Sequence, residues 1–369
     1  MNAMRRAAVG LSLPLVAALL AGCVSFDHGD AADPMPLPVR TTDGGVTDSL
    51  ATESLAADAL ATASLASDRF IAADGSALPL RAWLPDGPPS AVILALHGLN
   101  DYSNAFALPA PDLVAQGIAI YAYDQRGFGA APRRGRWAGD DAMTRDATLA
   151  AALLRQRYPS TPLYLLGESM GGAVAVLAVT GAAPAPVDGI ILAAPAVWGR
   201  QAMNVFERVG LWVLGVLPAL QFTQRSVPYT IHPSDNIPML RALGADPLVL
   251  KQARTETLAG VVDLMTAALA RAPHLAVPAL ILYGEKDEIV PRDAIASFVE
   301  TLPEAARHRQ RVALYPKGYH MLLRDLQGAT VRADVAAWIA DPRAALPSGA
   351  DSAGRALLSG GRDSVARLN

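Results

Sequence analysis

Short, largely aliphatic runs alternate along the chain with longer segments in which apolar residues recur at helical spacing. Continuous aliphatic runs are typical of strands buried on both faces of a parallel sheet. Strands are predicted at Ala91–Leu96, Ile118–Tyr123, Leu163–Leu166, Gly189–Ala193, Ala279–Tyr283 and Arg311–Tyr315. Helices are predicted between them, at Ala142–Arg157, Gly171–Thr180, Ala294–Thr301 and Thr330–Ile339. This alternation predicts an α/β fold, in which a mostly parallel sheet carries helices on both faces.

Two further features refine this outline. A hairpin of Arg69–Ala73 and Leu80–Leu84 around Asp74-Gly75 predicts an antiparallel edge to the sheet. The segment 198–273 interrupts the strand–helix rhythm, which predicts a helical cap inserted between strands. The sheet core is therefore expected at 68–197 and 274–343.

Composition excludes several classes of protein. The 369 residues are 52% hydrophobic and 18% charged, which is typical of a packed globular chain. The formal net charge of −3 gives no general attraction to nucleic acid, so no nucleic-acid partner is expected. A single cysteine excludes an internal disulfide and any multi-cysteine metal site. Nucleotide-loop, H-E-x-x-H and EF-hand patterns are absent from the sequence, so we expect no cofactor and no metal.

The one cysteine lies at the end of a predicted export signal. Arg5 and Arg6 precede an apolar stretch that is too short to span a bilayer and is interrupted by Pro14. The following Leu-Ala-Gly-Cys23 resembles the lipobox of bacterial lipoproteins, which implies removal of residues 1–22 and a lipid on Cys23. The alternative is an ordinary signal peptide in which Cys23 is incidental.

The lipobox resemblance also implies a location. Val24, in place of the aspartate that retains such proteins at the inner membrane, implies attachment to the outer membrane facing the periplasm. Residues 23–67 are rich in Ala, Asp, Ser, Thr and Pro and are expected to form the lipid anchor and a flexible tether. Residues 344–369 are expected to form a flexible tail.

The sequence Gly167-Glu-Ser169-Met-Gly171 follows a predicted strand and opens a predicted helix. This is the context of a nucleophile elbow, in which a tight turn holds the serine in a strained backbone conformation. The N–H of Met170 and the N–H of Leu99, in the loop after an earlier strand, are the expected oxyanion donors. The alternative is a tight turn with a capping serine.

A serine nucleophile needs a base that a third group orients. Of the six histidines, His320 alone lies on a short loop after the last predicted strand, and it is the expected base. Asp287, which follows the strand after the insert, is the expected acid. Its competitors are Asp293 at a helix start, Glu285 and Glu288.

These motifs together resemble the α/β-hydrolase superfamily, and within it the monoacylglycerol-lipase-like branch, which is also grouped with serine aminopeptidases. The resemblance spans about residues 69–340 and rests on H-G-L-N at His97, D-Q-R-G-F-G at Asp124, G-E-S-M-G-G at Gly167, G-E-K-D-E-I-V-P at Gly284 and G-Y-H at Gly318. It implies a serine hydrolase acting on acyl esters, with structural roles for Asp124 and Arg126. Ala130-Ala131 and Leu99 depart from the family pattern, and the bulk of Leu99 implies a narrower acyl pocket.

The substrate class stays open at this point. The cap portion Phe206–Phe222 is strongly apolar and is either packed core of the cap, which is the default, or a lid that meets acyl chains or membrane. The favoured function is hydrolysis of lipid-like esters, of the monoacylglycerol or lysophospholipid type, by a membrane-tethered enzyme. The alternatives are an aminopeptidase, a thioesterase or an acyltransferase with the same triad, and a catalytically silent envelope lipoprotein.

Overall fold

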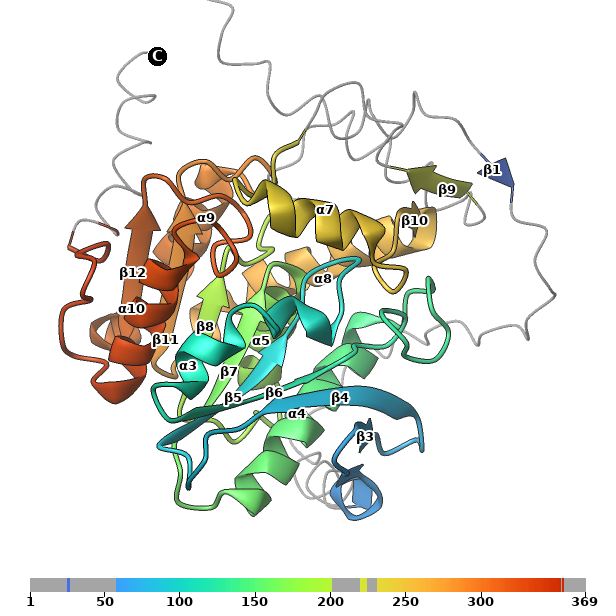
Figure 1. The fold of residues 1–369 in the computed structure, drawn as a ribbon, viewed down its shortest axis with the longest axis horizontal. Coiled ribbons are helices and arrows are strands. Elements are labelled where there is room, and N and C mark those ends of the chain that lie inside the picture. The colour runs from blue at the N-terminus through green and yellow to red at the C-terminus, as the bar shows by residue number, and fades with distance from the viewer. Residues whose placement is uncertain (1–24, 27–57, 201–219, 224–230, 353, 355–369) are drawn as a thin grey trace, which may run out of the picture.

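The computed structural model describes residues 25–26, 58–200, 220–223, 231–352 and 354. Within these residues a nine-stranded sheet has the order β12-β11-β8-β7-β5-β6-β4-β3-β2 (Figure 1). The six strands from β12 to β6 are parallel, and β4, β3 and β2 continue the sheet antiparallel. Its strands are β2 (Ser64–Leu65), β3 (Arg69–Ile71), β4 (Ala77–Trp83), β5 (Ala91–Leu96), β6 (Ile118–Tyr123), β7 (Leu163–Glu168), β8 (Gly189–Ala193), β11 (Ala279–Gly284) and β12 (Gln310–Tyr315).

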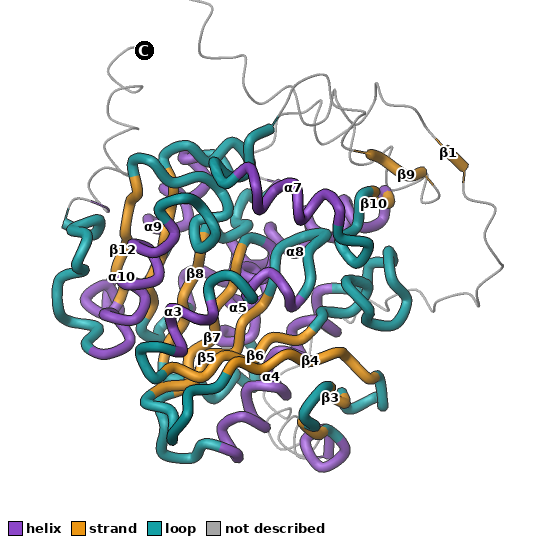
Figure 2. Tube along the Cα trace, in the orientation of Figure 1, coloured by secondary structure: helices purple, strands orange, loops and turns teal. Residues whose placement is uncertain are grey.

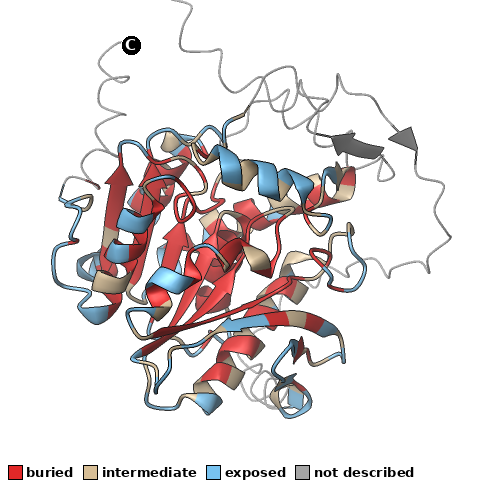
Figure 3. Cartoon of the chain, viewed as in Figure 1, coloured by how far each residue is buried: buried red, intermediate tan, exposed pale blue. Residues whose placement is uncertain are grey.

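Every residue of the strands β5, β6, β7, β8 and β11 is buried. Side chains alternate between two hydrophobic clusters, as Leu94 on one face and Ile93 on the other illustrate. Figure 3 shows this buried sheet between partly exposed helices. The continuous aliphatic runs arise because both faces of each strand must be apolar. The predicted α/β architecture with a mostly parallel sheet is confirmed, and so are the predicted strands.

Helices cover both faces of the sheet (Figure 2). On one face lie α3 (Ala110–Val114) and α10 (Gly328–Ala340), and on the other lie α4 (Asp140–Arg157), α5 (Met170–Thr180), α8 (Thr255–Arg271) and α9 (Arg292–Thr301). The four predicted helices are present as α4, α5, α9 and α10. The helix α8 falls inside the segment 198–273 predicted as cap, yet it packs against α5 of the core.

The hairpin between β3 and β4 turns where the sequence predicts it. Gly75 has φ +80°, a left-handed conformation that favours glycine, and the carboxylate of Asp74 accepts a hydrogen bond of 3.0 Å from Ser76 N. The predicted antiparallel edge is confirmed.

The helix α7 (Ile237–Ala245) lies beyond the end of the sheet toward which β8 and β12 point (Figure 1). Asn236 caps it by accepting a hydrogen bond of 3.2 Å from Met239 N, and none of its residues is fully buried. Close to it, β10 (Gln252–Arg254) pairs with β9 (Leu220–Thr223), which also pairs with β1 (Ser25–Phe26).

Several predictions concern residues outside the described part of the chain. These are the signal 1–22, the lipid site Cys23 and most of the apolar portion Phe206–Phe222. Across the described residues, no helix is both long enough and apolar enough to cross a bilayer.

Part of the predicted tail is held on the core. Leu346 is buried, and Leu314 N donates a hydrogen bond of 3.0 Å to Ala350 O. Arg311 pairs with Asp351, and Ser348 N donates to Asp334 Oδ1 over 3.0 Å. These contacts attach residues 344–352 to the core, and the flexibility expected of 344–369 stays a prediction.

Candidate active site

The order of the strands places the predicted site residues at one edge of the sheet. Ser169 follows β7, and the loop that carries Leu99 follows the neighbouring strand β5. Asp287 and His320 follow β11 and β12, which are also neighbours. One strand, β8, separates the two pairs, so the strand axes of β7 and β11 are about 10 Å apart. Side chains on the connecting loops can span that separation.

Ser169 occupies a strained backbone conformation, with φ +53° and ψ −114°. Close backbone packing around it leaves no room for side chains on the two motif glycines. A Cβ on Gly167 would lie 2.3 Å from Gly171 O, and a Cβ on Gly171 would lie 2.2 Å from Leu96 O. Ser169 N is fixed to Ala193 O at 3.0 Å. The turn therefore presents Ser169, partly exposed, at the start of α5.

Asp287 and His320 are hydrogen-bonded, with 2.8 Å between His320 Nδ1 and Asp287 Oδ2. Their two loops are joined by the backbone, since Lys286 N donates to Gly318 O over 2.9 Å. The other carboxylate oxygen of Asp287 accepts from Ile289 N at 2.8 Å and Val290 N at 3.0 Å. The contact between His320 and Asp287 fixes the tautomer of the imidazole, because Nδ1 must donate to the carboxylate. The other ring nitrogen, Nε2, is then able to accept a proton.

The three competing carboxylates lie elsewhere. Asp293 is exposed in the first turn of α9, where a negative charge suits the helix dipole. Glu285 lies 3.7 Å from the guanidinium of Arg292, and Glu288 accepts a hydrogen bond of 2.7 Å from His232 N.

The structure brings the imidazole to Asp287 and not into hydrogen-bond contact with the Ser169 hydroxyl. Among the described residues, no hydrogen bond joins Ser169 Oγ to His320. In enzymes without bound substrate such bonds are often long and shorten only in the complex.

Two buried histidines near the site have opposite pKa shifts. Burial lowers the pKa of His97, whose ring donates from Nδ1 to Gly98 O at 2.9 Å and accepts at Nε2 from Gln125 N at 3.0 Å. Burial also lowers the pKa of His320, but the charge and hydrogen bond of Asp287 outweigh it, so that pKa is raised. His97 is thus a neutral structural group that holds the loop after β5, whereas the surroundings of His320 favour an imidazolium.

The expected oxyanion donors are backbone groups on either side of Ser169. Met170 is the first residue of α5, so its N–H has no acceptor within the helix. Gly98 precedes Leu99 and approaches the nucleophile closely, because a Cβ there would lie 3.4 Å from Ser169 Cβ. Both N–H groups therefore belong to backbone that adjoins the serine.

Sequence reasoning missed a buried arginine that joins three parts of the site. Arg324, on the loop after His320, donates from Nη1 to Asp101 at 2.8 Å and from Nη2 to Glu168 at 2.7 Å. The three side chains are between 3% and 6% exposed. Burial alone would lower the pKa of Arg324, but the two carboxylates raise it, so the guanidinium stays charged. The one available signal was a charged pair, Arg324-Asp325, within an apolar run.

The same loop is also tied to the cap. Met321 N donates to Pro233 O at 2.9 Å, and the buried hydroxyl of Ser234 donates to Asp325 at 2.6 Å. Asp325 also accepts a hydrogen bond of 2.7 Å from Tyr319 N, the residue before His320. The start of α7 and the loop that carries the imidazole are therefore mechanically linked.

Asp124 and Arg126 have the structural positions that the resemblance implies. Asp124 accepts hydrogen bonds from Ser103 N at 3.0 Å and Ala130 N at 2.8 Å. Arg126 bridges Asp146 and Asp74. Among the described residues, no cluster of three His, Cys, Asp or Glu side chains is placed to hold a metal ion.

A protein-family model described as "Serine aminopeptidase, S33" matches residues 87–327, a range that includes Ser169, Asp287 and His320. The chain belongs to this family. The prediction that it is a serine hydrolase is thereby confirmed.

Individual relatives of this S33 chain agree with the assignment. Monoglyceride lipase of Homo sapiens is 28% identical over 274 residues, covering 70% of this chain and 85% of the relative. Monoacylglycerol lipase of Mycolicibacterium smegmatis is 25% identical over 279 residues, covering 73% and 95%. The solved structure of a soluble variant of monoglyceride lipase from Saccharomyces cerevisiae has a TM-score of 0.62 and 18% identity, covering 84% of this chain and 99% of that one. The structural match supports the fold.

Asp287→Asn tests the electrostatic part of this arrangement. Asn can still accept from Ile289 N and Val290 N, but it removes the charge that raises the pKa of His320. We expect kcat/KM for ester hydrolysis to fall by roughly 10³–10⁴-fold. Because a base acts in its neutral form, the acidic limb of the pH profile should move to lower pH in the variant. Asp293→Asn is the matched control, and an unmoved limb in Asp287→Asn would contradict the assignment.

Arg324→Met tests the buried charge bridge. The variant leaves the carboxylates of Glu168 and Asp101 buried without their cation, and we expect the free energy of unfolding to fall by about 3–5 kcal/mol. Urea unfolding measures it, with the exposed Arg307→Met as control. The additional changes Glu168→Gln and Asp101→Asn should restore part of the loss. A fall below about 1 kcal/mol would show that the bridge contributes little.

Proposed function

We propose that the protein hydrolyses carboxylic esters of lipid-like alcohols, of the monoacylglycerol or lysophospholipid type, through an acyl-enzyme on Ser169. The observation that carries the proposal is the 2.8 Å contact of His320 with Asp287, at the same edge of the sheet as the strained turn of Ser169. The ester chemistry is supported by relatives named as monoglyceride and monoacylglycerol lipases.

In the proposed mechanism, Ser169 Oγ attacks the ester carbonyl while His320 Nε2 takes the hydroxyl proton. Asp287 orients the imidazole ring of His320 and stabilises the imidazolium, and the raised pKa of His320 favours this charged form. The N–H groups of Leu99 and Met170 donate to the oxyanion. His320 then returns the proton to the leaving alcohol. Water, deprotonated by His320, releases the carboxylic acid and restores Ser169.

Exposed aliphatic side chains near the site support a lipid-like substrate. Ile289 follows Asp287 by two residues, Leu326 follows the loop of His320, and Ile237 begins α7. They are 39%, 70% and 46% exposed. Leu326 N donates to Asp235 Oδ1 at 2.8 Å, so Leu326 and the start of α7 are neighbours. Acyl chains are favoured partners of such surfaces, at about 0.8 kcal/mol per buried CH₂.

The alternatives named from sequence are separated by one panel of substrates. It contains monoacylglycerol, lysophospholipid, aminoacyl anilide and acyl thioester at matched concentrations. We expect the esters to be cleaved with the highest kcat/KM. Preferential cleavage of the anilide would favour an aminopeptidase, and no turnover of any substrate would favour a silent envelope protein.

A fluorophosphonate probe tests the nucleophile. The probe should label the wild-type protein, and Ser169→Ala should lose the label because the attacking oxygen is gone. Ser103→Ala, at a buried serine outside the proposed triad, is the matched control and should keep it. Equal labelling of wild type and Ser169→Ala would remove the mechanism.

We further propose that Cys23 carries a lipid that holds the enzyme at a bacterial membrane, facing the periplasm from the outer membrane. This rests on the sequence Leu-Ala-Gly-Cys and on Val24 after it. Stable anchoring needs more than one acyl chain, which lipoprotein processing supplies.

Metabolic labelling in a bacterial host tests this anchor. Radiolabelled palmitate should enter the wild-type protein, and Cys23→Ser should abolish incorporation and release the protein from the membrane fraction. Ser25→Ala, two residues away, is the control and should stay labelled. Palmitate in Cys23→Ser would refute the anchor.

A further inference from the structure

The helix α7 is hydrogen-bonded at each end to a different loop of the site. Asp246, which ends the helix, accepts at Oδ2 a hydrogen bond of 2.7 Å from Tyr102 Oη. Two residues before the N-cap, Ser234 Oγ donates to Asp325 Oδ1 over 2.6 Å. Tyr102 lies on the loop after β5 that carries the expected oxyanion donor, and Asp325 lies on the loop of the expected base. The nine residues of α7, about 13 Å in length, therefore span from one of these loops to the other.

The N-terminal end of α7 has a second bond to the loop of the base. The side chain of Asn236 caps the helix through Oδ1, and its Nδ2 donates to Arg324 O over 2.8 Å. Asp325 in turn accepts a hydrogen bond of 2.7 Å at Oδ2 from Tyr319 N, next to the imidazole in the chain. The position of the base is thus tied to the first turn of α7.

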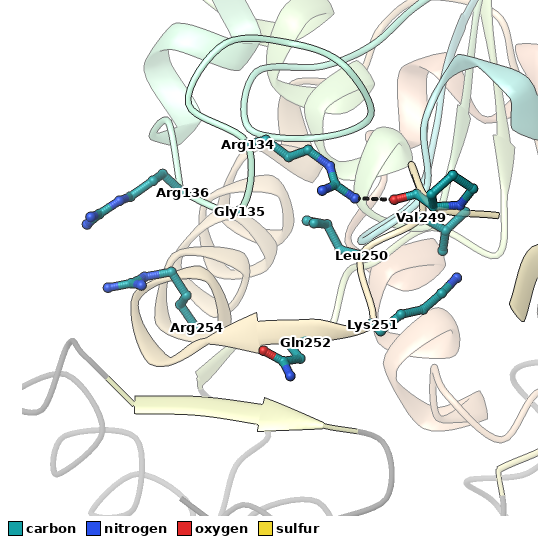
Figure 4. Close-up of a pocket in the computed structure, with 9 residues that line it drawn as sticks. Arg134, Gly135, Arg136, Val249, Leu250, Lys251, Gln252 and Arg254 are labelled. Carbon is teal, nitrogen blue, oxygen red and sulfur yellow. Dashed lines mark hydrogen bonds between the residues drawn. The ribbon is translucent and has the colours of Figure 1, made fainter. Parts of the chain in front are cut away.

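The segment that follows α7 is tied to the other loop and to the core. Leu250 N donates to Asn100 O over 2.9 Å, one residue after the expected oxyanion donor. The segment 247–254 and the loop 134–136 line a cavity of about 400 Å³, where Arg134 Nη2 donates to Pro247 O over 2.6 Å (Figure 4). The C-terminal end of α7 is therefore also held by more than one contact.

The two loops are joined directly to each other as well. Arg324 Nη1 donates to Asp101 Oδ2 over 2.8 Å, and Tyr102 N donates to Asp101 Oδ1 over 2.9 Å. Because Arg324 O accepts from the cap residue Asn236, these contacts and α7 form a closed ring. A closed ring leaves few independent motions, so a shift at one loop is passed to the other.

The two carboxylates that hold α7 lie where a negative charge is unfavourable. Asp246 is at the C-terminal end of a helix, where the helix dipole disfavours an anion. Asp325 is 4% exposed, burial raises its pKa, and within the described part of the chain no ion pair joins it to a cation. A neutral side chain could anchor the helix without this penalty. Charged acceptors give shorter and stronger hydrogen bonds, which suits contacts that must hold a fixed distance.

We propose that α7 is a rigid spacer that sets the positions of the base and of the oxyanion donor relative to Ser169, with Tyr102 and Asp325 as positioning residues. The inference rests on the proposed function and adds residues that act on the reaction through others. Among the described residues no hydrogen bond joins Ser169 Oγ to His320, so the approach of Nε2 to the hydroxyl depends on where its loop is held. A misplacement of about 1 Å can lower the rate by about 10²-fold.

Tyr102→Phe and Ser234→Ala test the two ends of the spacer, because each removes one hydroxyl. The readouts are the rate at which a fluorophosphonate labels Ser169, and kcat and KM for 4-nitrophenyl acetate, whose short acyl group gives the cap little to bind. We expect each variant to lower the labelling rate and kcat roughly 10- to 100-fold, with KM changed less than about twofold. Ser234→Thr keeps a hydroxyl and should retain most of both rates.

The double variant Tyr102→Phe/Ser234→Ala separates a spacer from two independent anchors. Free-energy effects of independent sites more than about 10 Å apart are additive, so the losses in rate would multiply. A spacer has no effect once either end is released, so the double variant should be only as slow as the slower single variant. Losses that multiply, or unchanged rates in both single variants, would overturn the proposal.

Tyr121→Phe and Ser348→Ala are the matched controls. Each removes a hydroxyl with a comparable bond outside the loops of the site, since Tyr121 is bonded to Tyr158 Oη over 2.7 Å and Ser348 to the carboxylate of Asp334. Both controls should keep the labelling rate and kcat of the wild type. The same loss in the controls as in Tyr102→Phe and Ser234→Ala would show a general effect of a missing hydroxyl and reject the spacer.

Labelling and turnover also separate this proposal from the proposed function. A wild type that is labelled but cleaves no ester would reject the ester hydrolysis, and the labelling rates would still decide on the spacer. Ester turnover with the same labelling rate in all variants would reject the spacer and keep the hydrolysis. A wild type that is neither labelled nor active would overturn both.

Discussion

The site depends on one buried cation. Arg324 bonds to Asp101 on the loop after β5 and to Glu168 immediately before Ser169, and it lies on the same short loop as His320. Separate strand ends are thereby held at fixed distances from each other. A charge bridge of this kind contributes little net stability compared with an apolar cluster of similar volume, but removal of one member is costly. Arg324 therefore acts mainly by positioning: it holds the loop after β5, the residue before Ser169 and the loop of His320 close together.

The direction of the pKa shift of each buried histidine is decided by its hydrogen-bond partner rather than by burial. His97 and His320 are both buried, yet the pKa of the first is lowered and that of the second is raised. His97 exchanges hydrogen bonds with backbone groups, which stabilise a neutral ring. His320 faces the carboxylate of Asp287, which stabilises the charged ring. The same residue type thus holds a loop as a neutral ring in one place and has a raised pKa beside a carboxylate in another.

The cap and the core meet in two chemically different places. Around Ile237 and Leu326 the surface is aliphatic, whereas the cavity at Arg134 and Lys251 is basic. Ser234 and Asp325 join the start of α7 to the loop of His320, so a displacement of α7 would be transmitted to the imidazole.

The sequence by itself determined the elements and the chemistry that depends on local spacing. Aliphatic runs identified the parallel strands, and Gly167 and Gly171 identified the elbow, because a strained turn and close backbone packing need glycine at those positions. Only the tertiary structure decided that Arg324 meets Asp101, 223 residues away, and Glu168, 156 residues away. It alone joined the basic residues of 134–136 and 247–254 into one cavity. The local pattern of apolar and polar residues indicates which face of each segment is buried. Which charged side chains pair with each other depends on the order of the strands in the sheet, because that order decides which loops lie close together.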